Sequence, residues 1–234
     1  ALEERARSAV SGPDAMSSLR QPGVRIIAEV KRRSPSAGDI RREAEPSVIA
    51  DLYERAGAAA ISVLTEPNHF GGSLDDLQAV TNTCSLPALR KDFIVSRRQL
   101  LEARVAGASM VLLITAGLED KELETLHAQA LDLGLQPLVE AHTAEEVRRS
   151  LGAGATLLGI NNRDLTTLRV DLAVAEALRS MIPTGVTPVA ESGVGSRADI
   201  DRLRRAGYDV FLVGSALMEA DDPARALKRL LEQE

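Results

Sequence analysis

The sequence has few of the residues that build disulfide frameworks, metal clusters or stacking surfaces. Among 234 residues there are one cysteine (Cys84), three histidines, three phenylalanines, two tyrosines and no tryptophan. A lone cysteine excludes a disulfide framework and fits a reducing compartment, so we expect a cytoplasmic protein. The small number of histidine and cysteine ligands predicts no metal site, and we expect no cofactor. So few aromatic rings also argue against a base-stacking surface for nucleic acids.

An excess of positive charge and long apolar runs are absent as well. The 28 basic and 34 acidic residues give a net charge of −6, which argues against nucleic-acid binding through bulk electrostatics. No apolar run approaches the roughly 20 residues of a membrane helix, and no basic and apolar leader opens the sequence, so we expect no membrane association. The hydrophobic fraction of 44% and the charged fraction of 26% are typical of a globular protein.

Short apolar, β-branched segments alternate with amphipathic helical segments along the chain. The strand-like segments are Val24–Val30, Ala59–Leu64, Ala88–Lys91, Ser109–Ile114, Leu135–Glu140, Thr156–Ile160, Thr187–Ala190 and Asp209–Val213. The helical segments between them include Pro46–Ala56, Arg97–Ala106, Glu119–Leu133, Ala144–Leu151 and Arg197–Ala206. Strands that alternate with helices in this way indicate parallel βαβ units.

Glycine follows several of these helices, where a left-handed C-cap would turn the chain into the next strand. The positions are Gly57, Gly107, Gly154 and Gly207. The length is close to the roughly 250 residues of one α/β barrel, and no segment reads as a charged, shortened edge strand. We therefore predict an α/β protein, a (βα)8 TIM barrel that forms one domain over residues 1–234, with a short helical N-terminal extension over 1–23. An open doubly wound sheet is the structural alternative.

Charged residues stand where the predicted strands end. Glu29 and Lys31 close the first strand, and Lys91, Glu140 and Glu191 close the third, fifth and seventh. Since side chains alternate along a strand, apolar neighbours that fill the barrel would direct these charges into its mouth, where barrel enzymes have their active sites. Any one of them could belong to a structural salt-bridge network, but the whole set favours function. Crowding and partial burial predict shifted pKa values, which suit general acid–base chemistry.

Two glycine–serine pairs follow the last two strands. Ser192 and Gly193 come after the seventh strand, and Gly214 and Ser215 come after the eighth, where a short helix would begin. Phosphate sites in barrels are commonly built at this position from backbone N–H groups. Either pair alone is ordinary turn chemistry, but together they favour a phosphate ligand. The loop that begins at Ser34 is a third possible donor, although by itself it reads as a plain turn.

Several motifs together resemble those of the indole-3-glycerol phosphate synthase family of tryptophan biosynthesis. The matching segments are Ile27–Ser36, Ser62–Glu66, Leu89–Phe93, Leu138–Glu140, Gly159–Leu165 and Ala190–Gly193. The resemblance runs in the same order from about Gly23 to the C-terminus. It implies a ring closure of 1-(2-carboxyphenylamino)-1-deoxyribulose 5-phosphate with loss of carbon dioxide and water.

The resemblance also implies roles for individual residues. Lys91 would be the general acid, and Lys31 would hold the anthranilate carboxylate and be a second candidate acid. Glu140 would be the base. Asn161 would support that base, and Glu29 and Glu191 would position the lysines and contact substrate hydroxyls. Arg163 would contact the substrate, and Ser192 would lie beside the ribulose. The phosphate would bind to Ser34, Gly193, Gly214 and Ser215, and the apolar wall would consist of Pro35, Phe70, Phe93 and Leu112. We expect each lysine to lower the pKa of the other, against the opposing effect of the carboxylates.

Three other functions fit parts of the pattern. A class I aldolase would use Lys91 as a Schiff-base nucleophile. A non-catalytic barrel would bind a sugar phosphate without turnover, and a sugar-phosphate isomerase would leave the paired lysines unexplained. His127 and His142 lie in or beside predicted helices, where we expect surface or capping roles. The expected partner is a small sugar-phosphate substrate, and we expect a monomer.

Overall fold

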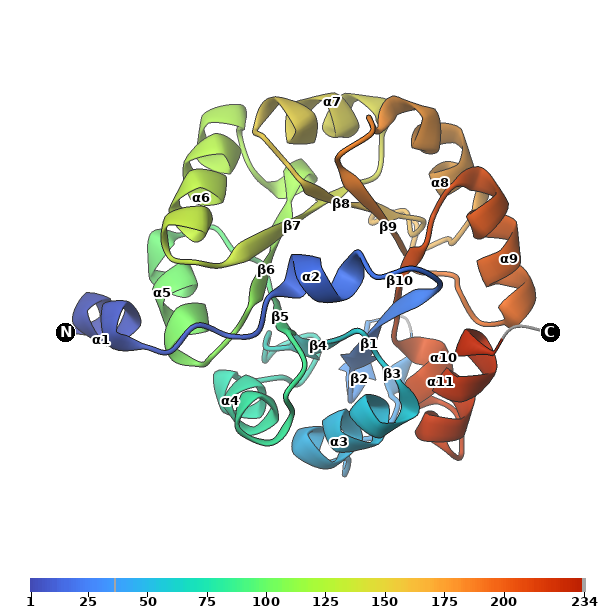
Figure 1. Ribbon diagram of the computed structural model, residues 1–234, viewed down its shortest axis with the longest axis horizontal. Coiled ribbons are helices and arrows are strands. Elements are labelled where there is room, and N and C mark those ends of the chain that lie inside the picture. The colour runs from blue at the N-terminus through green and yellow to red at the C-terminus, as the bar shows by residue number, and fades with distance from the viewer. Residues whose placement is uncertain (36, 233–234) are drawn as a thin grey trace.

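The computed structural model describes residues 1–35 and 37–232 and contains a closed barrel of eight parallel strands (Figure 1). The strands are β1 (Arg25–Val30), β4 (Ala60–Leu64), β5 (Ala88–Lys91), β6 (Met110–Ile114), β7 (Gln136–Ala141), β8 (Leu157–Asn161), β9 (Thr187–Glu191) and β10 (Val210–Val213). Because β1 pairs with both β4 and β10, the sheet closes and the open-sheet alternative is wrong. Each predicted strand lies within one residue of the observed bounds at either end.

Helices alternate with these strands and surround the barrel in Figure 1. They are α3 (Pro46–Ala56), α4 (Leu74–Thr83), α5 (Arg97–Val105), α6 (Asp120–Asp132), α7 (Ala144–Gly152), α8 (Ala173–Leu178), α9 (Arg197–Ala206), α10 (Ser215–Met218) and α11 (Pro223–Leu231), with 3-10 turns η1 (Thr115–Gly117) and η2 (Arg179–Met181). The predicted glycine caps are confirmed: Gly57 and Gly207 follow α3 and α9 with φ of 97° and 102°. Among the described residues, no helix is long and apolar enough to cross a membrane.

Two apolar layers hold the barrel together. One lies between the strands and the outer helices, and includes Tyr53, Leu100 and Phe211, all fully buried. The other fills the barrel interior, with one or more side chains from each strand. Its members from the strands are Ile27, Ala60, Leu89, Met110, Leu112, Leu138, Leu157, Val189, Val210 and Leu212. This interior layer is the floor beneath the mouth of the barrel.

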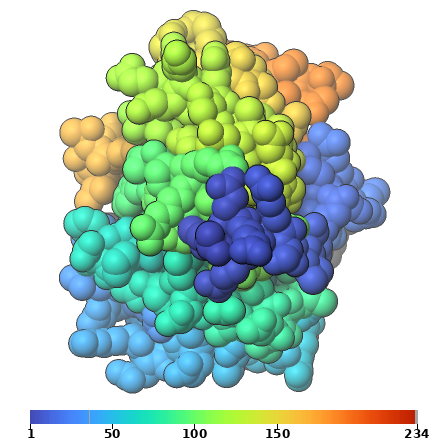
Figure 2. Space-filling view, turned by 90° about the vertical axis from the view of Figure 1, so that its left-hand side faces the viewer, coloured from blue at the N-terminus to red at the C-terminus, as the bar shows by residue number. Residues whose placement is uncertain are grey.

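The N-terminal segment forms two short helices, as expected. Helix α2 (Ala15–Leu19) lies across the end of the barrel at which the strands begin, and Ala15 and Leu19 join the interior layer. Ser18 fixes it there by donating a hydrogen bond of 2.6 Å to the carbonyl of Ala59, just before β4. Helix α1 (Leu2–Ser8) packs on the outside against α5, as Figure 2 shows in dark blue against green. The N-terminal end of the barrel is therefore closed.

A small antiparallel hairpin follows β1, made of β2 (Arg33–Ser34) and β3 (Gly38–Asp39). The sequence predicted only a loop here. Ser36 belongs to the motif noted above and lies outside the described residues.

Candidate active site

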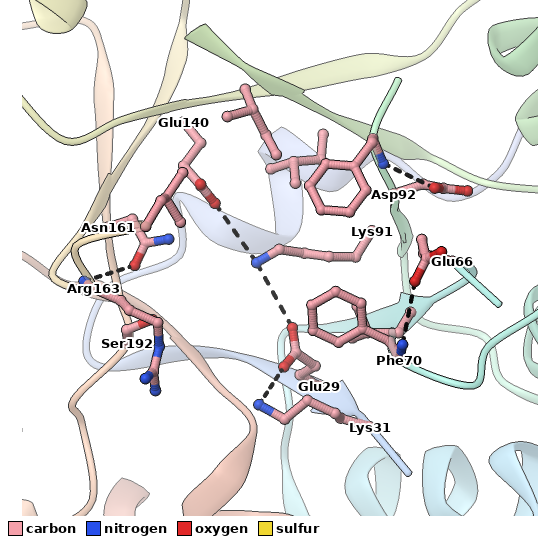
Figure 3. A pocket seen from close by; sticks show the side chains of 15 residues that line it. Glu29, Lys31, Glu66, Phe70, Lys91, Asp92, Glu140, Asn161, Arg163 and Ser192 are labelled. Carbon is pink, nitrogen blue, oxygen red and sulfur yellow. Dashed lines mark hydrogen bonds and ion pairs between the residues drawn. The ribbon is translucent and has the colours of Figure 1, made fainter. Parts of the chain in front are cut away.

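The charged residues predicted from the strand ends do converge at the carboxyl end of the barrel (Figure 3). Glu29, Lys91, Glu140 and Glu191 extend from β1, β5, β7 and β9, and Lys31 follows β1 directly. The three carboxylates are almost completely buried, with exposures of 5% or less. Glu29 and Glu140 line what we call the central pocket, together with Lys31 and Lys91. Its lining consists of Glu29, Lys31, Leu64, Glu66, Phe70, Lys91, Asp92, Phe93, Leu112, Ile114, Glu140, Asn161, Arg163, Leu165 and Ser192.

Lys91 is the centre of the charge cluster. Its Nζ lies 3.1 Å from Glu191 Oε2, 3.7 Å from Glu140 Oε2 and 3.8 Å from Glu29 Oε2. Burial alone would lower the pKa of Lys91, but the charges of Glu191, Glu29 and Glu140 raise it well above its ordinary value. The expected lowering of this pKa by Lys31 is therefore wrong. Three carboxylates outweigh one neighbouring ammonium, so Lys91 keeps its proton at neutral pH.

Glu29 joins the two lysines. Its Oε1 lies 3.2 Å from Lys31 Nζ while its Oε2 faces Lys91, so one carboxylate bridges both ammonium groups, as Figure 3 shows. Burial opposes ionisation of Glu29, but Lys31 and Lys91 overcome it and hold its pKa below the usual range. Lys31 also donates a hydrogen bond of 3.0 Å to Ser215 Oγ at the start of α10. The cluster thus extends from β7 to the turn after β10.

Glu191 lies behind Lys91. It is 1% exposed, and its Oε2 lies 3.1 Å from Lys91 Nζ, so it positions this lysine, while its contact with substrate hydroxyls stays a prediction. Burial raises the pKa of Glu191 to about 8; the Glu140 charge adds to this rise, and Lys91 opposes it.

Glycines make room for two of these carboxylates. A Cβ at Gly159 of β8 would come within 2.0 Å of Glu191 Oε1, and one at Gly214 within 2.4 Å of Glu29 Oε1. Any larger residue at either position would displace a carboxylate that contacts Lys91. Gly214 was predicted as part of a phosphate loop, and the structure adds this second reason for glycine there.

An apolar wall faces the charges across the central pocket. Phe70 and Phe93 lie with ring centroids 6.5 Å apart and planes at 47°, and Leu112 is buried beside them. Glu66 fixes the turn that carries Phe70, because its carboxylate accepts backbone N–H groups of residues 68–70. These hydrogen bonds hold the pKa of Glu66 below its usual value, although burial opposes them. Five residues that line this wall or the rim of the pocket were not predicted as site residues: Leu64, Glu66, Asp92, Ile114 and Leu165.

The turns after β8 and β9 supply polar groups at the opposite side of the pocket. Asn161 Oδ1 accepts the backbone N–H of Arg163 at 3.0 Å, and the Arg163 guanidinium donates to the carbonyl of Leu168. Ser192 has φ of 63° and Gly193 has φ of 82°, so two successive residues are left-handed. A non-glycine residue in this region is strained, which is common where function sets the backbone.

The residues predicted for the phosphate and for the Ser34 loop lie around this rim. Ser215 reaches the central pocket through Lys31, and Gly193 directly follows Ser192. Ser34 is buried in β2, where its hydroxyl accepts the N–H of Ala37. Pro35 is exposed in the hairpin and is not among the described residues of the pocket lining, so it does not form part of the apolar wall. The hairpin that replaces the expected loop accounts for this difference.

His142 departs from the surface or capping role that we expected for it. Its side chain is only 11% exposed, and its Nε2 lies 3.4 Å from Glu140 Oε1. The sequence does indicate this contact: His142 is two residues beyond Glu140, and side chains two residues apart along a strand point to the same side. The surface or capping role predicted for His127 is also wrong, because His127 is buried in α6, where burial lowers its pKa.

The chain is similar to known proteins over almost its whole length. Residues 1–230 match the profile of the family described as indole-3-glycerol phosphate synthase. The chain belongs to the indole-3-glycerol phosphate synthase family. The indole-3-glycerol phosphate synthase of Kineococcus radiotolerans is 48% identical over 235 residues, which cover 98% of this chain and 86% of that protein. The protein of the same name from Saccharopolyspora erythraea is 50% identical over 231 residues, with coverage of 98% and 86%.

A more distant likeness concerns the fold alone. The crystal structure of 3-hexulose-6-phosphate synthase from Salmonella typhimurium superposes with a TM-score of 0.69 at 16% identity, and covers 88% of this chain and 96% of that one. This chain thus shares the barrel fold with a protein of very different sequence.

Proposed function

We propose that this member of the indole-3-glycerol phosphate synthase family closes the indole ring of 1-(2-carboxyphenylamino)-1-deoxyribulose 5-phosphate by general acid–base catalysis. The observation that carries the proposal is the contact of Lys91 with three carboxylates at the floor of a pocket that has an aromatic wall. Lys91 carries a proton at neutral pH, as a general acid must, although the raised pKa makes it a weaker acid than a free lysine. The wall suits the flat ring of the substrate.

The two ends of this substrate need different surroundings. The benzene ring would lie against Phe70, Phe93 and Leu112, and Lys31 would pair with its carboxylate. The phosphate would bind to backbone N–H groups around Gly193, Gly214 and Ser215, supported by the left-handed backbone at residues 192–193. Arg163 and Ser34 add polar groups at the rim, and Ser192 lies between the two ends. The ribulose carbonyl would then lie above Lys91.

Ring closure requires a stronger electrophile than a free ketone. Lys91 would donate its proton to the ribulose C2 oxygen while the ring carbon that bears the carboxylate attacks C2. That carbon becomes tetrahedral and the ring nitrogen becomes an iminium. The iminium accepts the electron pair of the carbon–carboxylate bond as carbon dioxide leaves, so the decarboxylation needs no external electron acceptor.

Dehydration completes the indole. The C2 hydroxyl leaves as water after a lysine, Lys31 or Lys91, gives it a proton. Glu140 would take the proton that the new ring loses, with Asn161 supporting the base and Glu29 and Glu191 holding the lysines in place. Over the whole reaction the lysines give two protons and Glu140 takes one, so one proton per turnover comes from water, as the loss of a carboxylate as carbon dioxide requires.

We also propose a cytoplasmic monomer with residues 1–234 folded as one domain. The alternation of all eight strands with helices around a shared interior layer supports one domain. Size-exclusion chromatography with light scattering tests the monomer, and a mass near twice the chain mass of 25.0 kDa would reject it.

The absence of tryptophan allows a direct test of the activity. Because the sequence has no tryptophan, indole fluorescence that appears after substrate addition must come from the product. We expect such fluorescence together with one carbon dioxide per product. Heat protection by the substrate without fluorescence would indicate a binding protein instead. A borohydride-trapped adduct on Lys91 with a keto sugar phosphate would indicate the aldolase.

A further inference from the structure

Two cavities meet at the ends of β7 and β8. The central pocket is lined by Glu140 but not, among the described residues, by His142. A second cavity is lined by His142 and by exposed residues of the turn after β8, and it shares Asn161, Arg163 and Leu165 with the central pocket. Glu140 and His142 therefore face each other across the wall between a substrate pocket and a cavity that reaches the protein surface.

The imidazole of His142 is held on its other side. Its Nδ1 lies 3.0 Å from Glu146 Oε2, and its backbone N–H donates to the same oxygen at 2.7 Å. Glu146 is itself fixed at the start of α7, where its N–H donates to Thr143 Oγ1. The ring thus points Nε2 at Glu140 Oε1, 3.4 Å away.

This geometry leaves a place for one proton. An ionised Glu146 can only accept, so His142 Nδ1 carries a hydrogen and the neutral ring presents the Nε2 lone pair to Glu140. Nε2 is buried and makes no hydrogen bond within the described residues, and Glu140 Oε1 is its charged neighbour at 3.4 Å. The Nε2 lone pair and the carboxylate oxygen of Glu140 are both acceptors, so they repel each other unless one of the two carries a proton. The pair is therefore built to hold one proton and to pass it between the two groups.

Charged groups surround His142. The backbone N–H groups of Thr167 and Thr166 hold the pKa of Asp164 below its usual value, so Asp164 stays ionised near the imidazole. The charged and titratable groups that face His142 or line the second cavity with it are Glu140, Glu146, Arg163, Asp164, Arg169 and Asp171.

We propose that His142 is a positioning residue that takes the substrate proton from Glu140 and releases it into the second cavity. The inference rests on the proposed function, in which Glu140 is the base. Glu140 accepts the proton from the new ring and passes it to Nε2, which restores the carboxylate and forms imidazolium. The imidazolium then loses one proton to water in the second cavity and returns to its neutral form. One proton travels from substrate to solvent while the mouth of the barrel stays filled with product.

The test replaces His142 with residues that cannot carry a proton. In His142→Asn the amide can keep the contact with Glu146 but has no atom at the Nε2 position. We expect a single-turnover rate about tenfold or more below wild type, with KM unchanged because His142 does not line the central pocket. Added imidazole should restore part of the rate of His142→Ala. His127→Asn is the matched control, since His127 is also buried with an unpartnered Nε2 but lies in α6, and it should keep the wild-type rate.

A second variant tests the inference through charge alone. In Glu146→Gln the hydrogen bond to His142 can form, but the charge that stabilises imidazolium is lost, so the acid limb of the pH–rate profile should move to lower pH. The inference would be overturned if His142→Asn and Glu146→Gln both kept the wild-type rate and pH profile, or if imidazole did not raise the rate of His142→Ala. The proposed function would still stand in that case, provided that the wild type forms product. Absence of product from the wild type would reject the proposed function itself.

Discussion

The two ends of the barrel are built from the same strands with opposite chemistry. At the N-terminal end, helix α2 places Ala15 and Leu19 against the interior layer and closes it with apolar contacts. At the carboxyl end, the strands finish in Lys91 and three buried carboxylates, with a pocket above them. Since both ends share every strand, a residue's position along a strand decides whether it serves packing or chemistry.

This contrast separates stability from activity. Apolar burial contributes stability in proportion to the area removed from water, so each side chain at the closed end should matter for folding. A cluster of buried charges is weak support for folding, because desolvation of the ions offsets their attraction. Such a cluster at the open end is better explained by catalysis than by stability. Substitutions at the closed end should therefore lower the free energy of unfolding, and substitutions at the open end should lower the catalytic rate.

The largest expected effects lie at the open end. Lys91→Ala removes the proposed acid and Glu140→Gln the proposed base, and each should lower kcat by more than about a hundredfold, the scale of a lost general acid or base. Single-turnover indole fluorescence measures the rate without interference from product release. Near-normal rates in either variant would remove that residue from its role and weaken the contrast between the ends.

The reciprocal change is Leu19→Ala at the closed end. Leu19 is 2% exposed in the interior layer, so truncation should leave a cavity and lower the free energy of unfolding by about 2–5 kcal/mol. We expect little change in kcat well below the melting temperature, because the site lies at the far end of the strands. Urea denaturation and the same fluorescence assay check both statements. A large loss of kcat with unchanged stability would contradict the division of roles.

A methyl group at Gly159 should disturb the open end without removing any charge. Gly159→Ala would push Glu191 Oε1 away from its place 2.0 Å from the new Cβ, and Lys91 would lose its shortest contact. We expect kcat to fall roughly tenfold to a hundredfold through misplacement of Lys91. Gly117→Ala is the matched control, since a Cβ there meets nothing within 4 Å. Equal rates for the two variants would show that the position of Glu191 does not matter.

The smallest expected effect concerns the pH dependence of stability. Burial raises the pKa of Glu191 from 4.5 to about 8, so between these values the folded state holds a proton that the unfolded state has lost. The stability that this group contributes is therefore full below about pH 4.5 and declines as pH rises towards 8. Glu191→Gln should remove this decline. Urea denaturation from pH 5 to pH 8.5 measures it, and parallel curves for variant and wild type would count against a proton on Glu191.

Much of the molecule could be predicted from the sequence, because its signals are local. The strands were predicted within one residue since each is a short apolar run between a glycine turn and a helix, as at Gly57 and Gly207. The side-chain alternation that pairs Leu89 with Lys91 and Leu138 with Glu140 also predicted which charges meet at the mouth. These predictions need only the two-residue alternation of side chains along a strand and the rule that the active sites of barrel enzymes lie at the carboxyl ends of the strands. Neither requires coordinates.

The remaining features depend on distances between strands that are far apart in sequence. Lys91 receives carboxylates from β1, β7 and β9, and only their combined proximity decides that its pKa rises. The depth of Glu191 behind Lys91 likewise depends on how β5 and β9 lie across the barrel from each other. The position of His142 does not, because His142 is only two residues beyond Glu140 in the sequence. Pro35 was predicted for the apolar wall but lies exposed in the β2–β3 hairpin, which has no clear signal of its own in the sequence.

A crystal structure with the product bound tests the central claim most directly. The account predicts indole-3-glycerol phosphate in the central pocket, with its ring against Phe70, Phe93 and Leu112 and its phosphate at the turns of Gly193 and Ser215. Lys91, Lys31 and Glu140 should all contact this one molecule. Product bound elsewhere, or bound in the pocket with Lys91 and Glu140 both out of reach, would contradict it.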